Sequence, residues 1–165
     1  MWGEISMEMK ISGRAPCEVA TVETDPWVPL KIRWDVLQGA QPVYLFASGI
    51  SGGYVEIKID PLAGAVISLT VIDEPPLAEG RFDEVSSSGS DPSVPLVDLS
   101  QLGGADPGSI ARIDCPMSWS RRGESFTLRF ARGIPQTVIG CGSVLVFVDS
   151  EGRMLGVSAS AGAPE

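Results

Sequence analysis

Alternating hydrophobic and polar residues dominate this chain and predict β-strands. The clearest case lies between Tyr54 and Asp73, where two alternating arms flank a short break at 60–64. In the first arm, Val55, Ile57 and Ile59 alternate with charged residues. Successive side chains of a strand point to opposite faces, so this arm has one buried face and one solvent face.

The break between the two arms has the residues of a tight turn. Asp60 can accept hydrogen bonds from the amides that follow it, and Pro61 fixes φ near the value of a type I turn. Gly64 can adopt the positive φ that closes such a hairpin. We therefore predict a β-hairpin over 54–73, and because a lone hairpin is marginal in water it needs further strands to pack on.

Other segments repeat this pattern. Alternation predicts strands over 5–12, 17–24, 30–36, 43–47, 126–131, 144–148 and 154–159, with a break at 13–16 and a second aspartate-to-glycine turn at 149–152. The strand over 144–148 is apolar on both faces, which indicates a central position in a sheet. Helical turns are expected only at 77–85 and 99–102. The fold class predicted is mainly β, an antiparallel β-sandwich or open barrel of short hairpin-connected strands.

The stretch from Asp73 to Asp98 differs from the rest. It holds seven acids against the single base Arg81, together with four prolines and a serine-rich run. We predict a loop over 73–98 inside a single β-rich domain that spans residues 1–165. The sequence Asp25–Leu30 (DPWVPL) is nearly repeated at Asp91–Leu96 (DPSVPL). The repeat comes either from an internal duplication or from independent use of the same turn residues.

One residue type that is common in catalytic and metal sites is absent. The chain has no histidine, which excludes histidine-activated serine or cysteine nucleophiles and histidine-ligated metals. Cys17, Cys115 and Cys141 lack the spacing of a zinc site and are expected to be buried or half-buried free thiols. The glycine-rich run 49–53 lacks the lysine of a phosphate-binding loop, so we expect a flexible lead-in to the hairpin there. The run 140–143 lacks the residue order of a nucleophile turn, so we expect a bulge or a tight bend. We expect no catalytic activity, no bound cofactor and no bound metal ion.

Charge narrows the possible partners. The net charge is −9, and the excess of acids lies before residue 100. Such a chain repels nucleic acid and anionic membranes and attracts a basic protein. The arginines nearest Trp119 form a local basic cluster along the sequence, which could pair with the acidic loop or contact a ligand: Arg112, Arg121, Arg122, Arg129 and Arg132.

Trp27 is a candidate interface residue because prolines surround it in a predicted turn, although it could instead fold back over the core. Exposed tryptophans contribute strongly to binding energy at interfaces. The acids of the predicted loop complete the candidate partner-binding set, which is Trp27, Glu79, Asp83, Glu84 and Asp91.

A small, acidic, histidine-free β-rich chain with these features resembles, in general format, the immunity proteins of bacterial polymorphic toxin systems. That resemblance implies a non-catalytic inhibitor that neutralises a basic protein toxin by occluding its active site. The alternative is a carrier or sensor of a small ligand with an apolar β-barrel cavity. An enzyme using carboxylates or Cys115, and a subunit that adds strands edge to edge, are further hypotheses. The chain start has no signal-peptide pattern, which predicts a cytoplasmic location.

Overall fold

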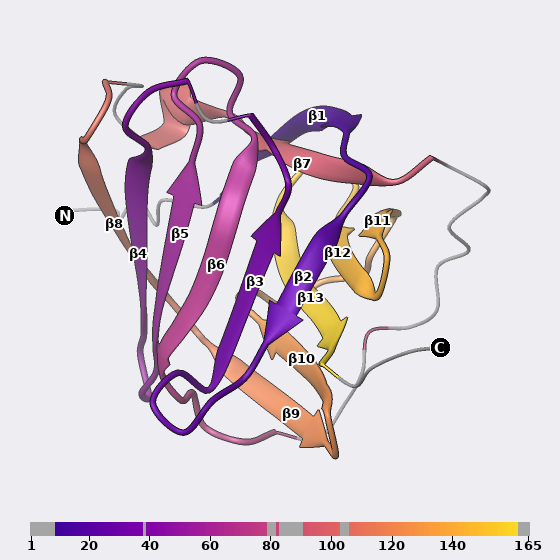
Figure 1. The fold of residues 1–165 in the computed structure, drawn as a ribbon. Coiled ribbons are helices and arrows are strands. Elements are labelled where there is room, and N and C mark those ends of the chain that lie inside the picture. Colours follow the sequence, from indigo (N-terminus) through magenta and orange to yellow (C-terminus); the bar gives the residue numbers. More distant parts are fainter. Residues whose placement is uncertain (1–8, 38, 79–81, 83–90, 103–105, 162–165) are drawn as a thin grey trace, which may run out of the picture.

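Two β-sheets face each other across a shared hydrophobic core, and a pair of strands lies at one end (Figure 1). The computed structural model describes residues 9–37, 39–78, 82, 91–102 and 106–161. The fold is mainly β, as the alternation predicts, and its helical content in these residues is one 3-10 turn at Leu99–Leu102. That turn confirms one of the two helical turns expected from the sequence.

Six strands form the larger sheet. Their spatial order is β2 (Ala20–Glu23), β3 (Leu30–Trp34), β6 (Val66–Asp73), β5 (Tyr54–Ile59), β4 (Val43–Gly49) and β8 (Ile110–Cys115). All neighbours in this sheet are antiparallel except β4 and β8, which are parallel. A mainly antiparallel sheet with short connections agrees with the hairpin-rich chain.

Five strands form the opposing sheet. Their order is β11 (Thr137–Cys141), β12 (Val144–Val148), β13 (Met154–Ser160), β10 (Ser125–Arg129) and β9 (Ser118–Arg122). Strands β1 (Ile11–Pro16) and β7 (Ser93–Val97) pair with each other in a separate two-stranded sheet. Only Pro116 and Met117 separate β8 from β9, so the chain passes directly from the larger sheet into the opposing one.

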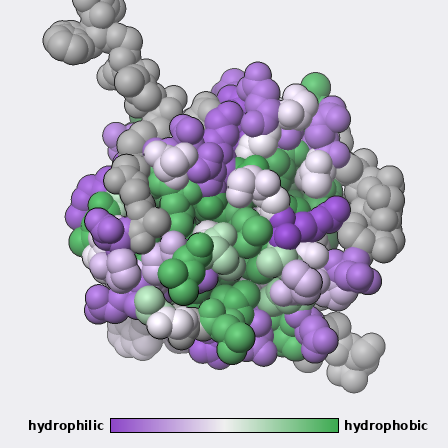
Figure 2. Space-filling view, turned by 90° about the horizontal axis from the view of Figure 1, so that it is seen from above, coloured by the Kyte–Doolittle hydropathy of each residue, from purple (hydrophilic) through white to green (hydrophobic). Residues whose placement is uncertain are grey.

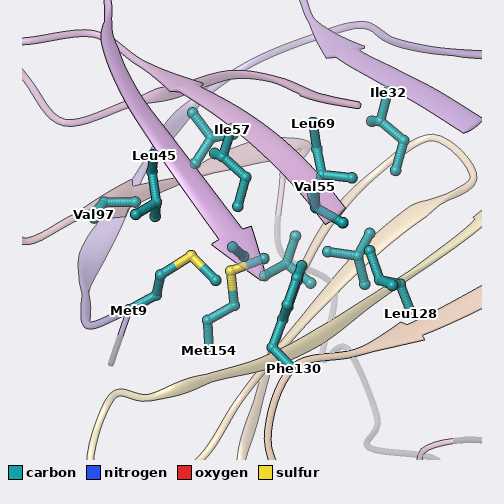
Figure 3. Packing of buried hydrophobic residues seen from close by; sticks show 14 of the residues in the cluster. Met9, Ile32, Leu45, Val55, Ile57, Leu69, Val97, Leu128, Phe130 and Met154 are labelled. Carbon is teal, nitrogen blue, oxygen red and sulfur yellow. The ribbon is translucent and has the colours of Figure 1, made fainter. Parts of the chain in front are cut away.

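The core consists of the inward-facing residues of both sheets. Figure 3 shows Leu45, Ile57 and Leu69 from the larger sheet on one side and Leu128 and Phe130 from the opposing half on the other. The largest fully buried side chains include Trp34, Trp119 and Phe126. The alternation places these apolar residues on one face of each strand, and the removal of that apolar surface from water holds the sheets together.

The central hairpin forms as predicted. The carboxylate of Asp60 accepts hydrogen bonds from the N–H of Leu62 and of Ala63, at 3.4 and 3.2 Å. Gly64 has φ of 82° and donates its N–H to the Asp60 carbonyl at 2.8 Å. The carboxylate and the glycine therefore close the β5–β6 turn together.

The predicted strand over 144–148 is confirmed as an internal strand, β12, between β11 and β13. Its outward face is covered by Phe82, whose ring lies 4.4 Å from that of Phe147 and stacks on it. Phe82, Val138, Phe147 and Leu155 form a second small hydrophobic cluster. This cluster is the physical reason why β12 is apolar on both faces.

Several boundaries differ from those predicted. Strand β1 continues through Gly13–Pro16, where a break was expected, because this segment pairs with β7 in a register that shifts between Ile11 and Gly13. The predicted loop over 73–98 contains strand β7, and its residues 79–81 and 83–90 lie outside the described part of the chain. Strands β8, β9 and β11 were missed because their alternation is short or interrupted by charged residues.

The two copies of the repeated sequence have different structures. Residues 25–29 form the turn between β2 and β3, whereas Ser93–Val97 form strand β7. The repeated sequence therefore does not mark two equivalent structural units.

Candidate partner-binding surface

Trp27 lies on a turn that its neighbours hold in place. The Asp25 carboxylate accepts the N–H of Trp27 at 2.7 Å and the N–H of Val28 at 2.6 Å, and the Asp25 N–H donates to the Val28 carbonyl. Pro26 and Pro29 further restrict the backbone. The Trp27 side chain is 88% exposed, so it does not fold back over the core. A large aromatic residue is thus presented to solvent on an ordered turn.

Other exposed apolar side chains lie at the same end of the sandwich. The chain runs through this end at residues 23–29, 50–53 and 72–78, the lower end in Figure 1. We call these three segments the Trp27 end. Besides Trp27 it exposes Ile50 (73%), Leu77 (75%) and part of Ile72. Gly52 and Pro76 adjoin each other, so the second and third segments are neighbours.

Acidic residues accompany these apolar groups. Glu23 ends β2, Asp73 ends β6, and Asp25 and Glu74 follow these strands; all four are exposed. Because β3 pairs with both β2 and β6, the ends of the two strands lie on either side of one strand of the sheet. The Trp27 end therefore combines exposed apolar side chains with negative charge.

An open hollow of about 340 Å³ lies beside the turn. Its lining comes from the first and third segments and from β9: Thr24, Asp25, Pro26, Pro29, Glu74 and Arg121. The Arg121 guanidinium lies 5.2 Å from the centre of the Phe126 ring, and its Nε donates to the Gly123 carbonyl at 3.4 Å. The carboxylates of Asp25 and Glu74 and the guanidinium of Arg121 make the hollow polar, so it can accommodate charged or hydrogen-bonding side chains.

The acids named from the sequence do not join this surface in the described structure. Glu79, Asp83 and Glu84 lie outside the described residues. Asp91 is exposed just before β7, and the next residue, Pro92, accepts a hydrogen bond from the Cys17 N–H, ahead of β2. Trp27 follows the other end of β2. The structure therefore separates Asp91 from Trp27.

The arginines near Trp119 in the sequence are divided between the two sheets. Arg112 lies on β8 of the larger sheet, where it packs over Phe46 and donates to the Tyr54 hydroxyl at 3.2 Å. Arg129 lies on β10 of the opposing sheet, 4.3 Å from the Phe82 ring centre. Neighbours in sequence thus belong to different sheets. Phe82 does link the 73–98 segment to one of these arginines.

The two glycine-rich segments considered for catalysis lie at strand ends and connections in the described residues. Gly49 ends β4 and residues 50–53 connect it to β5, and Gly142, with φ of 60°, lies in the tight connection of β11 to β12. All three cysteines are buried and free. Burial, with a smaller effect of Asp114, raises the pKa of Cys115 to about 11, so its thiolate is scarce at neutral pH. Within the described residues no group of three potential metal ligands occurs.

Of the residues at this surface, the sequence singled out Trp27 and Arg121 but not the acids around them. The acids Glu23, Asp73 and Glu74 stand at the ends of predicted strands, which is the signal that could have grouped them. Arg121 was named as part of the basic cluster, but its place beside these acids depends on how β9 packs.

The described residues contain no helix that is long and apolar enough to cross a membrane. No protein-family model matches the chain, and no similar curated protein is found.

Proposed function

We propose that this protein is a non-catalytic binding protein that uses its Trp27 end to contact a basic protein. The observation that carries the proposal is Trp27 itself, 88% exposed on a turn that the Asp25 carboxylate fixes. Exposing a large indole to water is unfavourable, and indoles are among the residues that contribute most when an interface buries them.

Charge supports the choice of partner. Four exposed acids accompany the apolar side chains of the Trp27 end, and the chain carries a net charge of −9. Opposite charge steers association and disfavours partners of like charge. The specific form of the proposal is an immunity-type inhibitor that covers the active site of a basic toxin.

The core offers less support for the ligand carrier. Trp34, Trp119 and Phe126 are among the side chains that fill the space between the sheets. In a carrier, residues at these positions would line a cavity instead. We therefore place the binding surface outside the sandwich, at the Trp27 end.

Affinity capture from the native lysate, at low and high salt, tests this proposal. The tagged protein should retain a basic protein that high salt releases. With that partner purified, Trp27→Ala should weaken binding about 30-fold, the effect of losing about 2 kcal/mol at an interface hot spot.

Leu62→Ala is the matched control. Leu62 is 82% exposed but lies in the β5–β6 turn, at the opposite end of the sandwich. Figure 2 shows that this opposite end also carries hydrophobic residues among hydrophilic ones, so the comparison decides which end binds. A loss of binding in Leu62→Ala but not in Trp27→Ala would reject the Trp27 end.

A further inference from the structure

Two buried thiols from distant parts of the chain meet at one edge of the sandwich. Cys17 lies between β1 and β2, and Cys141 is the last residue of β11, 124 positions further along. Their exposed fractions are 4% and 1%. The Cys141 thiol donates a hydrogen bond to the Cys17 carbonyl at 3.2 Å. This places the Cys141 sulfur against the backbone of Cys17.

The two side chains also influence each other electrostatically. Burial raises the pKa of Cys141 to about 11, with further contributions from the charge of the Cys17 thiolate and from a hydrogen bond between the two side chains. The Cys17 thiol itself lies 3.4 Å from the Val19 carbonyl and 3.7 Å from the Asp35 carbonyl, to which it donates. Since the thiolate is the reactive form, the folded protein keeps Cys141 in an unreactive state at neutral pH.

At this edge of the sandwich the chain does not pass from one sheet to the other within the described residues, in contrast to the opposite edge. At the opposite edge, the chain runs from β8 into β9 through two residues and so joins the two sheets. Here β2 and β11 are edge strands of different sheets, and no strand pairing joins them in the described residues. A bond between Cys17 and Cys141 would tie the chain next to β2 to the opposing sheet.

We propose that Cys17 and Cys141 are a disulfide-forming pair that closes this edge of the sandwich under oxidising conditions. The oxidant is a low-molecular-weight disulfide. One protein thiolate attacks a sulfur of the oxidant, forming a mixed disulfide and releasing one small thiol. The other protein thiolate attacks the mixed disulfide at the protein sulfur and releases the second small thiol. The two protons lost by the cysteines end on the released thiols, so the protein is oxidised and the oxidant is reduced.

Refolding in a glutathione redox buffer tests the pair without depending on access to buried thiols. The full chain is unfolded, refolded with reduced and oxidised glutathione, treated with an alkylating agent and digested without reduction. Mass spectrometry should find the peptides of Cys17 and Cys141 linked, and Cys115 alkylated. Links that involve Cys115 at equal abundance, or alkylation of all three cysteines, would overturn the proposal.

Single cysteine variants distinguish a specific link between Cys17 and Cys141 from a general effect of oxidation. Cys115→Ser should keep the link, whereas Cys17→Ser and Cys141→Ser should each abolish it. The oxidised wild-type protein should have a Tm about 5 to 15 °C above that of the reduced protein, because the link closes a long loop in the unfolded chain. A linked protein with a lower Tm would show that the native edge does not accommodate the bond, and it would also reject the proposal.

Discussion

Single aspartates fix two of the hairpin turns of this fold, those that join β12 to β13 and β5 to β6. The Asp149 carboxylate accepts the N–H of Glu151 and of Arg153, both at 2.9 Å, and pairs with the Arg153 side chain at 2.7 Å. Asp60 holds the β5–β6 turn through its own two amide bonds. Buried carboxylates of this kind are tolerated because hydrogen bonds replace the water they lose.

We predict that Asp149→Asn destabilises the protein at pH 7 by about 1 to 3 kcal/mol, the loss expected when charge-assisted hydrogen bonds are removed. Thermal unfolding measures this effect. Asp114→Asn is the control, because Asp114 is exposed on β8, and it should leave Tm nearly unchanged.

The stabilisation by Asp149 should depend on pH. Burial raises the pKa of Asp149, but the hydrogen bonds and charge of Arg153 and the Glu151 N–H outweigh burial, so the pKa lies below its ordinary value of 3.8. A lowered pKa means that the contribution is present above pH 3.8 and is lost as the pH falls through the pKa of the folded state. The difference in Tm between wild type and Asp149→Asn should therefore shrink at low pH. A constant difference from pH 7 to pH 2 would contradict this assignment.

At the scale of elements, Phe82, a residue from a distant segment, packs on the outer face of the opposing sheet. Phe82 is buried against Phe147 beneath the Arg129 guanidinium. Gly156 permits this packing, because a Cβ there would lie 2.7 Å from the Phe82 ring and also collide with the Leu128 carbonyl. Among the described residues, Phe82 thereby joins the 73–98 segment to the outer face of this sheet.

Phe82→Ala should lower the free energy of unfolding by about 3 kcal/mol, the loss typical of a buried phenylalanine. Chemical denaturation measures it. Leu77→Ala, which removes a 75% exposed side chain from a nearby part of the chain, should change it by less than about 0.5 kcal/mol. Equal effects of the two substitutions would mean that Phe82 does not anchor the segment.

At the scale of the whole molecule, charge is expected to act on the rate of association. The acids of the Trp27 end that do not hold the turn are Glu23, Asp73 and Glu74, and all are exposed. Long-range attraction between exposed charges accelerates encounter and is screened by salt.

We predict that the triple change Glu23→Gln, Asp73→Asn and Glu74→Gln lowers the association rate constant with the proposed basic partner about tenfold at low salt, with a smaller effect on dissociation. Stopped-flow measurements over a range of salt concentrations test it. The control neutralises three exposed acids at the opposite end, Glu18, Asp35 and Asp106. If both triple variants slow association equally, net charge rather than the Trp27 end steers the partner.

The sequence determined the local structure wherever neighbouring residues suffice to specify it. Alternation placed the strands of the central hairpin, Asp60 and Gly64 marked its turn, and two apolar faces marked β12 as internal. The exposed turn at Trp27 was one of two alternatives because prolines restrict the backbone without deciding which way the indole points.

Only the tertiary structure decided which distant residues meet. It paired Gly13–Pro16 with β7, covered β12 with Phe82, assigned the arginines around Trp119 to two different sheets and brought Cys17 to Cys141. These contacts depend on strand order and on the packing of one sheet on the other. Periodicity along the chain reports which face of a strand is buried, but it carries no record of the partner that buries it.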